Sequence, residues 1–383
     1  MLQFIIDLKL ENNYYLIIEW GGKKQMRKFK VATVFSGIGA AEQALELLKV
    51  PHEVVFACDN GERYLDLSTE EIYIKLIGKT HDEIQKIVEE LYNNSGKENN
   101  VKKSYLANYG DNLGEWYEDI RFLDGKLYQN EDIDIMIGGS PCQSFSTYGH
   151  RKGLEDTRGT LFYDYARLID EMKPKSFIFE NVTGLMNHDK GKTWEIIKEV
   201  FESLNYKIKY EVLNAQDYNL PQLRKRLFVV GIRKDIKKEF IFPEKKQLQI
   251  KVEDLLEKDV PNKYYLGFKG FRYVTTHERN EGRARVNREV IGCQTANQQF
   301  NWTGDFRVEN PKKIHLNDER IFKGEFDGKI SVARKLTPRE CLRLMGFEQF
   351  KIVVPDQVMY RQCGNSIAVP VMKELIKNIL EVI

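Results

Sequence analysis

Short apolar segments alternate with helix-forming segments from residue 31 onward, and this alternation restricts the fold more than any other feature. Residues 31–35 and 54–57 have the composition of strands, and Ala41, Leu45 and Leu48 between them recur at helical spacing. The alternation continues with strands at 134–137, 176–179, 208–213 and 227–232 and with helices near 160–172 and 191–204. Such a pattern is typical of a doubly wound, mainly parallel sheet, so we predict an α/β fold.

Two of these predicted strands end in reactive side chains. Two glycines, a serine and a proline separate the strand at 134–137 from Cys142, and they place this thiol on a strand-end loop. The strand at 176–179 stops at Glu180, and a carboxylate next to a core strand requires a partner or a function. Open α/β sheets place their chemistry at strand ends. Cys142 could also be a buried structural thiol, the commonest fate of a free cysteine, but its Pro-Cys-Gln loop context disfavours this alternative.

Six blocks of the sequence resemble motifs of the DNA cytosine-C5 methyltransferases and occur in the order typical of that family. They are Phe35-Ser-Gly37-Ile-Gly39, Gly138-Gly-Ser-Pro141-Cys142-Gln143, Phe179-Glu180-Asn181-Val182, Gln222-Leu-Arg224-Lys-Arg226, Arg334-Lys-Leu-Thr337-Pro-Arg339-Glu340 and Gln362-Cys-Gly364-Asn365-Ser366. The resemblance covers most of residues 31–250 and 334–383. It implies a Rossmann-like, S-adenosylmethionine-dependent catalytic domain and a second, smaller target-recognition domain.

The resemblance also implies a role for each catalytic candidate. The Cys142 thiolate would add to C6 of cytosine and make C5 nucleophilic. Glu180 would contact N3 and the amino group of the base, and burial should raise its pKa so that it can donate a proton. Arg226 would bind the cytosine O2, with Arg224 on a phosphate or on the catalytic loop. Asn181 would hold the loop that carries Cys142.

The glycine loop at 35–39 is a weak signal alone, because such turns serve dinucleotides, S-adenosylmethionine or no ligand. A dinucleotide fingerprint would need a small residue where Glu42 stands, which disfavours a nicotinamide enzyme. Asp59 is expected to accept both ribose hydroxyls, and Asp119 resembles the acid that accepts from the adenine amino group, although it could be a solvated turn acid. The predicted cofactor contacts are Phe35, Gly37, Ile38, Gly39, Asp59, Asn60, Asp119, Ile120, Pro141, Leu161, Asn365 and Ser366.

Two polar regions are candidates for binding double-stranded DNA. Residues 145–160 combine glycines with basic side chains and suit a loop that closes over an extruded base, although they could form an ordinary exposed loop. Residues 261–333 carry 13 Lys plus Arg against 9 Asp plus Glu and lie where the family keeps its recognition domain. Arg, Asn and Gln read bases but also occur in polar loops. The predicted DNA contacts are Gln143, Ser146, Arg151, Lys152, Arg158, Arg283, Arg285 and Gln298.

We predict five segments in the chain. Residues 1–29 form a hairpin that is either an accessory sheet or edge addition, or a separate binding module. Residues 30–243 form the catalytic and cofactor-binding domain. Within it, residues 60–104 are a charged, helix-prone insertion on the surface, either inert or in contact with DNA. Residues 244–354 form the target-recognition domain, and residues 355–383 return to the catalytic domain.

Bulk properties restrict the function further. The net charge of +2 is too small to indicate nucleic-acid binding by itself. The five cysteines include no Cys-x-x-Cys pair and no metal-ligand spacing with the six histidines, so we predict no metal site and reduced thiols in a cytoplasm. No segment approaches the length of a membrane span, about 20 apolar residues. We expect a monomer, and the family would allow a companion restriction endonuclease without a stable complex.

Two other functions remain open. One branch of the family methylates transfer RNA, which a region as large as 244–333 disfavours. A catalytically idle DNA-binding regulator is disfavoured because Cys142, Glu180, Arg224 and Arg226 are all present. We therefore predict a site-specific DNA methyltransferase that acts on cytosine C5 through a covalent Cys–C6 adduct and base flipping, within or derived from a restriction-modification system.

Overall fold

The computed structural model describes most of the chain and divides it into two compact units. The described residues are 4–10, 13–20, 23–141, 161–276, 284–297, 299, 302–312 and 317–383. Unit 1 consists of residues 1–213, 225–244 and 372–383, and unit 2 consists of residues 214–224 and 245–371.

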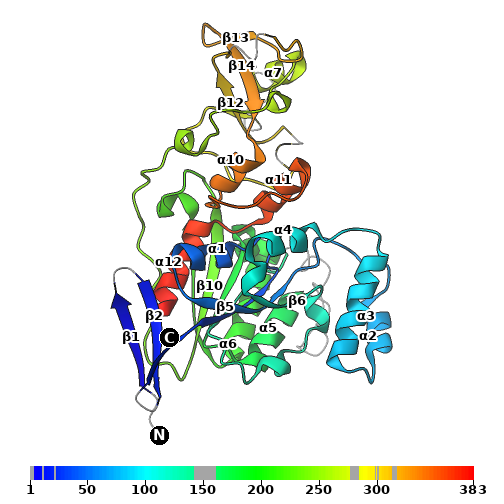
Figure 1. Ribbon diagram of the computed structural model, residues 1–383, viewed down its shortest axis with the longest axis vertical. Helices are drawn as coiled ribbons and strands as arrows, with labels where there is room; N and C mark the ends of the chain where they lie inside the picture. Colours follow the sequence, from blue (N-terminus) through cyan, green and yellow to red (C-terminus); the bar gives the residue numbers. More distant parts are fainter. Residues whose placement is uncertain are drawn as a thin grey trace. The chain divides into compact units, whose positions relative to one another are not determined.

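Within its described residues, unit 1 contains a seven-stranded sheet in the order β6-β5-β4-β7-β8-β10-β9 (Figure 1). The strands are β4 (Phe29–Val34), β5 (His52–Cys58), β6 (Leu113–Tyr117), β7 (Ile135–Gly138), β8 (Ser176–Val182), β9 (Tyr206–Asn214) and β10 (Lys225–Arg233). The ladders from β6 to β8 are parallel, and β10 is antiparallel to β8. The carboxyl ends of β4 to β8 therefore meet at one edge of the sheet, where we expected the site.

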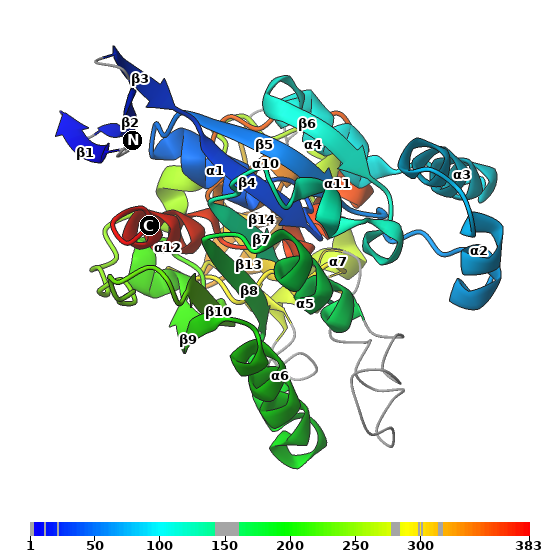
Figure 2. The same cartoon turned by 90° about the horizontal axis from the view of Figure 1, so that it is seen from below.

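Helices cover both faces of this sheet (Figure 2). On one face lie α5 (Leu161–Met172) and α6 (Lys192–Ser203), whose apolar stripes pack on the strands in a core rich in aromatic rings. On the other face lie α1 (Ala40–Leu47) and α12 (Val369–Leu380), as Figures 1 and 2 show together. The predicted doubly wound α/β fold is confirmed.

Two strands differ from the prediction. The edge strand β6 was not predicted, because Gly114 and Glu115 interrupt its apolar pattern and both are exposed. Strand β8 was expected to stop at Glu180 but runs to Val182, because its backbone pairs with β10 as far as the Arg226–Val182 register. Glu180 therefore lies within a strand and not on a loop.

The N-terminal segment forms a sheet of its own. The predicted hairpin is confirmed as β1 (Phe4–Leu10) and β2 (Asn13–Trp20), and a third strand, β3 (Lys23–Arg27), extends it by antiparallel pairing with β2. This three-stranded sheet is separate from the main sheet. The segment therefore forms the expected accessory sheet and does not extend the edge of the main sheet.

The predicted insertion is folded. It contains α2 (Thr69–Leu76) and α3 (His81–Asn94), and each helix begins with a capping box, at Ser68 and Thr80. A small apolar core formed by Ile72, Leu76, Val88 and Tyr92 joins them. The next helix, α4 (Asn100–Tyr109), leads into β6.

Unit 2 has a smaller sheet in the order β11-β12-β14-β13. Its elements are β11 (Arg285–Val286), β12 (Asp305–Glu309), β13 (Gly324–Phe326), β14 (Lys329–Lys335), α7 (Phe268–Thr275), α10 (Pro338–Arg343) and α11 (Asp356–Asn365). Helix α10 starts after Thr337, which caps it in a capping box with Glu340, and Pro338 follows the cap. Arg334 is 1% exposed and pairs with Glu340 at 2.8 Å, so its charge is compensated within unit 2.

The compact units and the predicted functional domains have different boundaries. Residues 214–224 and 355–371 lie in unit 2, whereas the sequence analysis placed them in the catalytic domain. The assignment of functions to 30–243 and 244–354 stays a prediction. No helix in the described part of the chain is both long and apolar enough to cross a membrane.

Candidate active site

Glu180 and Arg226 form an ion pair on adjacent strands. Glu180 lies opposite Phe228 in the β8–β10 ladder, so Arg226, two residues along β10, is its diagonal neighbour on the same face. The Arg226 Nε lies 3.1 Å from the Glu180 Oε1, and the two side chains are 17% and 14% exposed. The structure thus brings together two of the four predicted catalytic residues and leaves them partly accessible.

The segment that leads to Cys142 packs against this pair. A Cβ added at Gly139 would lie 2.7 Å from the Glu180 main-chain oxygen and 2.9 Å from its Oε2, so only glycine fits there. The Asn181 side chain donates to the Ser140 main-chain oxygen at 2.9 Å, and both residues are buried. This contact confirms that Asn181 holds the segment before Cys142, as expected, at Ser140. Cys142 itself lies outside the described residues.

Arg224 is placed differently from Arg226. It is 3% exposed and belongs to unit 2, where its guanidinium donates to the main-chain oxygens of Gln294, Gly364 and Ser366 at 2.8, 3.0 and 2.5 Å. These contacts fix the turn after α11, so the geometry gives Arg224 a structural role. The contact with a phosphate or with the catalytic loop that we expected stays a prediction.

The loop at 35–39 is held in an uncommon backbone conformation. Phe35, Gly37 and Gly39 have φ values of 53°, 55° and 80°, and a bulky residue such as Phe35 rarely adopts this region outside functional sites. A Cβ added at Gly39 would lie 2.3 Å from the Tyr109 ring, so packing explains this glycine. At Gly37 the nearest atom to an added Cβ would be the Phe35 main-chain oxygen at 4.0 Å, an ordinary van der Waals contact, so packing does not explain this glycine. Ile38 is 1% exposed, so its side chain belongs to the core.

Asp59, directly after β5, is fixed by main-chain amides. Its Oδ2 accepts from the Gly37 N–H at 2.9 Å and its Oδ1 from the Gly61 N–H at 2.8 Å. Burial raises the pKa of this carboxyl, and the two amide hydrogen bonds partly offset that effect. A carboxylate offers about four acceptor positions, so Asp59 keeps capacity for two more donors. The site as built could accept the two ribose hydroxyls that we assigned to it.

Asp119, which follows β6, is 5% exposed, so the alternative of a solvated turn acid is wrong. Its carboxylate accepts from the Tyr92 hydroxyl at 2.7 Å and from the Arg121 Nη2 at 2.6 Å. Because β5 and β6 pair in parallel with Cys58 opposite Tyr117, Asp59 and Asp119 follow the ends of neighbouring strands. Both acids thus belong to the same edge of the sheet.

The remaining cofactor candidates occupy varied positions. Asn60 closes a turn, because its Oδ1 accepts from the Glu62 N–H at 3.0 Å, whereas Ile120 is buried. Leu161 is half-buried at the start of α5, and Pro141 is exposed. In unit 2, Asn365 is exposed and Ser366 is buried. A Cβ on Gly364 would lie 2.3 Å from the main chain of residues 295–296, which explains the glycine in this motif.

The sequence analysis missed a buried ionic network beside Asp119. Glu118 is 6% exposed and pairs with Arg63, with Lys102 at 3.0 Å and with the Asn99 amide at 2.7 Å. The Asn99 amide also donates to the Asp59 main-chain oxygen at 2.9 Å. The only available signal was the pair of consecutive acids after Trp116 and Tyr117, since acids beside buried aromatic residues require donors, and the insertion supplies them.

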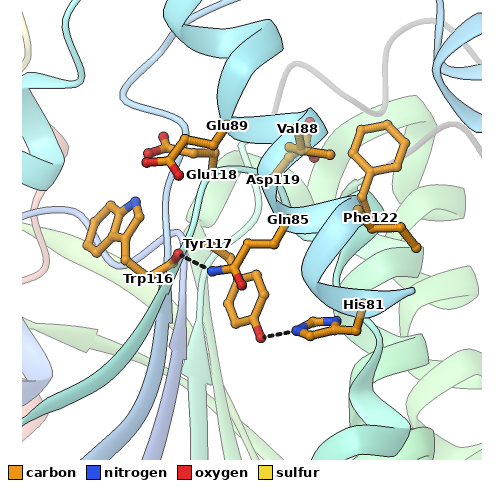
Figure 3. Close-up of a pocket in the computed structure, with 10 residues that line it drawn as sticks. His81, Gln85, Val88, Glu89, Trp116, Tyr117, Glu118, Asp119 and Phe122 are labelled. Atoms are coloured by element: carbon orange, nitrogen blue, oxygen red, sulfur yellow. Dashed lines mark hydrogen bonds between the residues drawn. The ribbon is translucent and has the colours of Figure 1, made fainter. Parts of the chain in front are cut away.

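A pocket lies between α3 and the end of β6 (Figure 3). His81, Gln85 and Val88 line it from α3, and Trp116 and Asp119 line it from the β6 side. Hydrogen bonds cross it from His81 to the Tyr117 hydroxyl at 3.0 Å and from Gln85 to the Trp116 main-chain oxygen at 3.4 Å. These two hydrogen bonds attach α3 of the insertion to β6, the strand that precedes Asp119.

Most of the predicted DNA contacts cannot be placed. Gln143, Ser146, Arg151, Lys152, Arg158, Arg283 and Gln298 lie outside the described residues. Arg285 pairs with Asp305 at 3.0 Å and packs against Gly292, contacts that hold β11 beside β12. Its contact with DNA stays a prediction.

The fold and the motif positions agree with a comparison against known families. The family model for C-5 cytosine-specific DNA methylases matches residues 29–381. The chain belongs to this family. It is therefore a DNA (cytosine-5)-methyltransferase, and S-adenosylmethionine is its methyl donor.

Relatives in sequence support the assignment, and a solved structure supports the fold. The Type II methyltransferase M.SsoII of Shigella sonnei is 38% identical over 73% of this chain and 71% of that protein, and M.HpaII of Haemophilus parainfluenzae is 37% identical over 73% and 80%. The orphan methyltransferase M.SPRI of Bacillus phage SPR is 38% identical over 93% and 98%. A DNMT2 structure from Spodoptera frugiperda matches the fold with a TM-score of 0.64 at 18% identity, over 92% of this chain and 99% of that one.

The described residues of unit 1 fit S-adenosylmethionine. Among the described residues and apart from its chain neighbours, only the Phe35 main-chain oxygen, 4.0 Å away, would contact a Cβ at Gly37, so the backbone there is not crowded and a ligand can approach it. The Asp59 carboxylate keeps acceptor capacity for hydroxyl donors. Both lie at the carboxyl edge of the sheet, and β4, which leads to Gly37, pairs directly with β7, which leads to Cys142.

Proposed function

We propose that this enzyme methylates C5 of cytosine at specific sites in duplex DNA, through a covalent adduct between Cys142 and C6 of a flipped base. The observation that carries the proposal is the Glu180–Arg226 pair at 3.1 Å. N3 and O2 are neighbouring positions of the cytosine ring, so the groups that bind them must themselves be neighbours. Glu180 and Arg226 meet this requirement beside the segment that leads to Cys142.

The chain's own residues then have distinct tasks. The Cys142 thiolate adds to C6, which moves electron density towards C5. Glu180 holds a proton at N3, and Arg226 donates to O2, so that the ring accepts the negative charge of the adduct. S-adenosylmethionine supplies an electrophilic methyl group. After transfer, loss of the C5 proton and departure of the Cys142 sulfur restore the aromatic ring and the thiolate.

Cofactor binding is proposed for the loop and the acids at the strand ends. The Gly37 backbone would contact the methionine moiety, Asp59 would accept the ribose hydroxyls, and Asp119 would accept from the adenine amino group. Phe35 would lie against the adenine or the sulfonium. The remaining candidates, Ile38, Gly39, Asn60, Ile120, Pro141, Leu161, Asn365 and Ser366, would complete the site, with Ile38 contributing only main-chain atoms.

Duplex DNA is the proposed substrate because the matching family is that of the C-5 cytosine-specific DNA methylases, and relatives at 37–38% identity are named Type II methyltransferases or an orphan methyltransferase of a phage. We further propose that the chain acts as a monomer in the cytoplasm, within or derived from a restriction-modification system. A companion endonuclease would then recognise the same site without a stable complex. Unit 2 contains most of the predicted recognition domain.

A labelling experiment tests the substrate and the nucleophile together. The purified protein is incubated with methyl-labelled S-adenosylmethionine and either unmethylated duplex DNA or transfer RNA, and the products are digested to nucleosides. We expect label in 5-methyldeoxycytidine, and we expect it to disappear in Cys142→Ala but not in Cys293→Ala, a half-buried thiol in unit 2. DNA with 5-fluorocytosine should trap a covalent complex, since the adduct cannot lose fluorine from C5.

The alternatives give different results. Label found only in the RNA would move the substrate to transfer RNA. DNA binding without label in either nucleic acid would indicate the idle regulator. Full activity in Cys142→Ala would refute the covalent mechanism.

A further inference from the structure

The two helices of the insertion bind the residues that surround Asp119. The Tyr92 hydroxyl of α3 donates to the Asp119 Oδ2 at 2.7 Å. The Arg121 Nη1 donates to the Thr69 Oγ1 of α2 at 2.7 Å, and the Tyr73 hydroxyl of α2 donates to the Arg121 main-chain oxygen at 3.0 Å. A segment that the catalytic motifs do not include therefore contacts an acid of the proposed cofactor site.

The donors are distributed unequally over the two oxygens of Asp119. Oδ2 accepts from the Tyr92 hydroxyl and from the Arg121 Nη2 at 2.6 Å. Oδ1 accepts from the Arg121 main-chain N–H at 3.0 Å, and it shares the Arg121 Nε with Oδ2, at 3.0 and 3.1 Å. Oδ1 thus accepts one hydrogen bond and a share of the bifurcated Nε bond, whereas Oδ2 accepts two and the other share, so Oδ1 is the less occupied oxygen.

Tyr92 is itself firmly held. It is 1% exposed within the core of the insertion, and the Arg63 guanidinium lies over its ring at 4.8 Å from the centroid. Burial, followed by the charge of Asp119, raises the pKa of Tyr92, so the hydroxyl stays protonated and can only donate to the carboxylate. A buried ring in a capped helix loses little additional freedom when it makes this bond.

We propose that Tyr92 is a positioning residue for cofactor recognition, which fills Oδ2 of Asp119 and leaves Oδ1 for the adenine amino group. This proposal rests on the proposed function, since it requires that Asp119 reads the cofactor's base. The insertion is then part of the cofactor-binding apparatus, neither inert nor dedicated to DNA. The insertion thereby sets how strongly the site prefers adenine over a base that carries an oxygen in place of the amino group.

The physical reason is the cost of a mismatched buried group. A base with a carbonyl in place of the amino group would set an oxygen against the Asp119 carboxylate, and a site built to accept a hydrogen bond strongly rejects such an analogue. If the Tyr92 hydroxyl is removed, Arg121 can shift towards Oδ2 and the carboxylate can turn. The selectivity then falls even though the overall fold is kept.

The test compares the reaction product, S-adenosylhomocysteine, with its analogue S-inosylhomocysteine. In the analogue an oxygen replaces the adenine amino group. Their dissociation constants are measured by calorimetry with the full chain, wild type and Tyr92→Phe. The wild type should prefer the adenine compound by roughly tenfold or more, and Tyr92→Phe should reduce this ratio by about threefold or more. The KM for S-adenosylmethionine should rise while kcat at saturation and the KM for DNA stay unchanged.

Tyr73→Phe is the matched control, because the Tyr73 hydroxyl binds the main-chain oxygen of Arg121 and contacts neither the Asp119 carboxylate nor the guanidinium, whereas Thr69 binds the guanidinium that holds this carboxylate. It should keep the wild-type ratio. Thr69→Val removes the contact between α2 and Arg121, and it should reduce the ratio as Tyr92→Phe does. This variant provides a second test if Tyr92→Phe folds poorly.

The failures can be told apart. A wild-type ratio near one would show that Asp119 does not read the amino group and would overturn the proposal, while methylation of DNA would still uphold the proposed function. A large ratio that Tyr92→Phe leaves unchanged would overturn the role of Tyr92 alone. An equal loss of selectivity in Tyr73→Phe would indicate general loosening of the insertion and would also overturn the role of Tyr92.

Discussion

Two buried acids of unit 1 and two buried arginines of unit 2 are compensated in different ways. In unit 1, Glu42 and Asp59 are held by neutral hydroxyl and amide donors, and burial raises the pKa of each. In unit 2, the guanidinium groups of Arg224 and Arg334 are bound by several carbonyl or carboxylate oxygens. A buried group with several matched partners is part of the framework, whereas an acid with acceptor capacity left can bind a ligand.

The largest expected effect concerns the proposed catalytic pair of unit 1, Glu180 and Arg226. Glu180→Gln should lower kcat by about 10²–10⁴-fold, because an amide cannot carry the proton that the base requires at N3. Binding of S-adenosylmethionine should be unchanged. Steady-state methylation assays and calorimetry provide the two measurements.

Glu171→Gln is the matched control, since Glu171 pairs with Arg167 at 3.0 Å and is 17% exposed but lies on α5. Its kcat should equal that of the wild type. A Glu180→Gln enzyme with wild-type kcat would remove the reason for treating the Glu180–Arg226 pair as catalytic.

The next effect compares the two arginines of one motif. Arg224→Met should lower the free energy of unfolding by about 3 kcal/mol or more, because it leaves main-chain oxygens in unit 2 without their buried donor. Arg226→Met should cost at most about 1 kcal/mol, since its ion pair is partly exposed, yet it should abolish methylation. Denaturant unfolding of both variants measures the loss of stability, and activity assays measure the loss of methylation. Equal stabilities would contradict the structural role of Arg224.

A smaller effect is expected at Asp59. Asp59→Asn should weaken S-adenosylmethionine binding by roughly tenfold, because an amide offers one oxygen where the carboxylate offers two. Calorimetry measures the change. Asp124→Asn serves as the control, since Asp124 also accepts from a main-chain N–H, that of Lys126 at 3.0 Å, but has no assigned role. Similar weakening in both variants would argue against a ribose contact at Asp59.

The smallest effect is the pH dependence contributed by Glu42. Because burial raises its pKa in the folded chain, the protonated form favours folding. Its contribution is therefore fully present below the unfolded value of about 4.3 and is lost as the pH rises through the folded pKa. Relative to Glu42→Gln, the wild type should lose stability as the pH rises, as measured by denaturant unfolding at several pH values.

Glu71 provides a control of opposite sign. Hydrogen bonds from the Ser68 cap lower the pKa of Glu71, so its contribution is present above the unfolded value and is lost as the pH falls. Relative to Glu71→Gln, the wild type should therefore gain stability as the pH rises. The same trend in both comparisons would show that burial does not raise the pKa of Glu42.

Local patterns predicted much of the fold. The apolar runs that became β4, β5, β7 and β10 and the cap at Thr337 depend on neighbours in sequence, so they could be read without the structure. Edge strand β6 was missed because a strand paired on one side tolerates exposed glycine and glutamate. The extension of β8 was missed because backbone pairing with β10 does not require apolar side chains.

The candidate site was predictable in kind but not in arrangement. The motifs identified Glu180, Arg226, Asp59 and Asp119, and the structure places them at or beside strand ends on the same edge of one sheet. Tyr92 was not found, because its contact with Asp119 joins residues 27 positions apart through a helix whose pattern shows only amphipathic spacing. Its function depends on which atom its hydroxyl meets.

The sequence by itself determined the α/β class and the family, because these follow from hydrophobic periodicity, turn residues and the order of the motifs. Only the tertiary structure decided that Arg224 binds main-chain oxygens while Arg226 meets a carboxylate, and that the insertion supports Asp119. The partners of Arg224 lie 70 to 142 positions away along the chain. Hydrogen-bond partners at such separations are selected when the chain packs, so no local pattern records them.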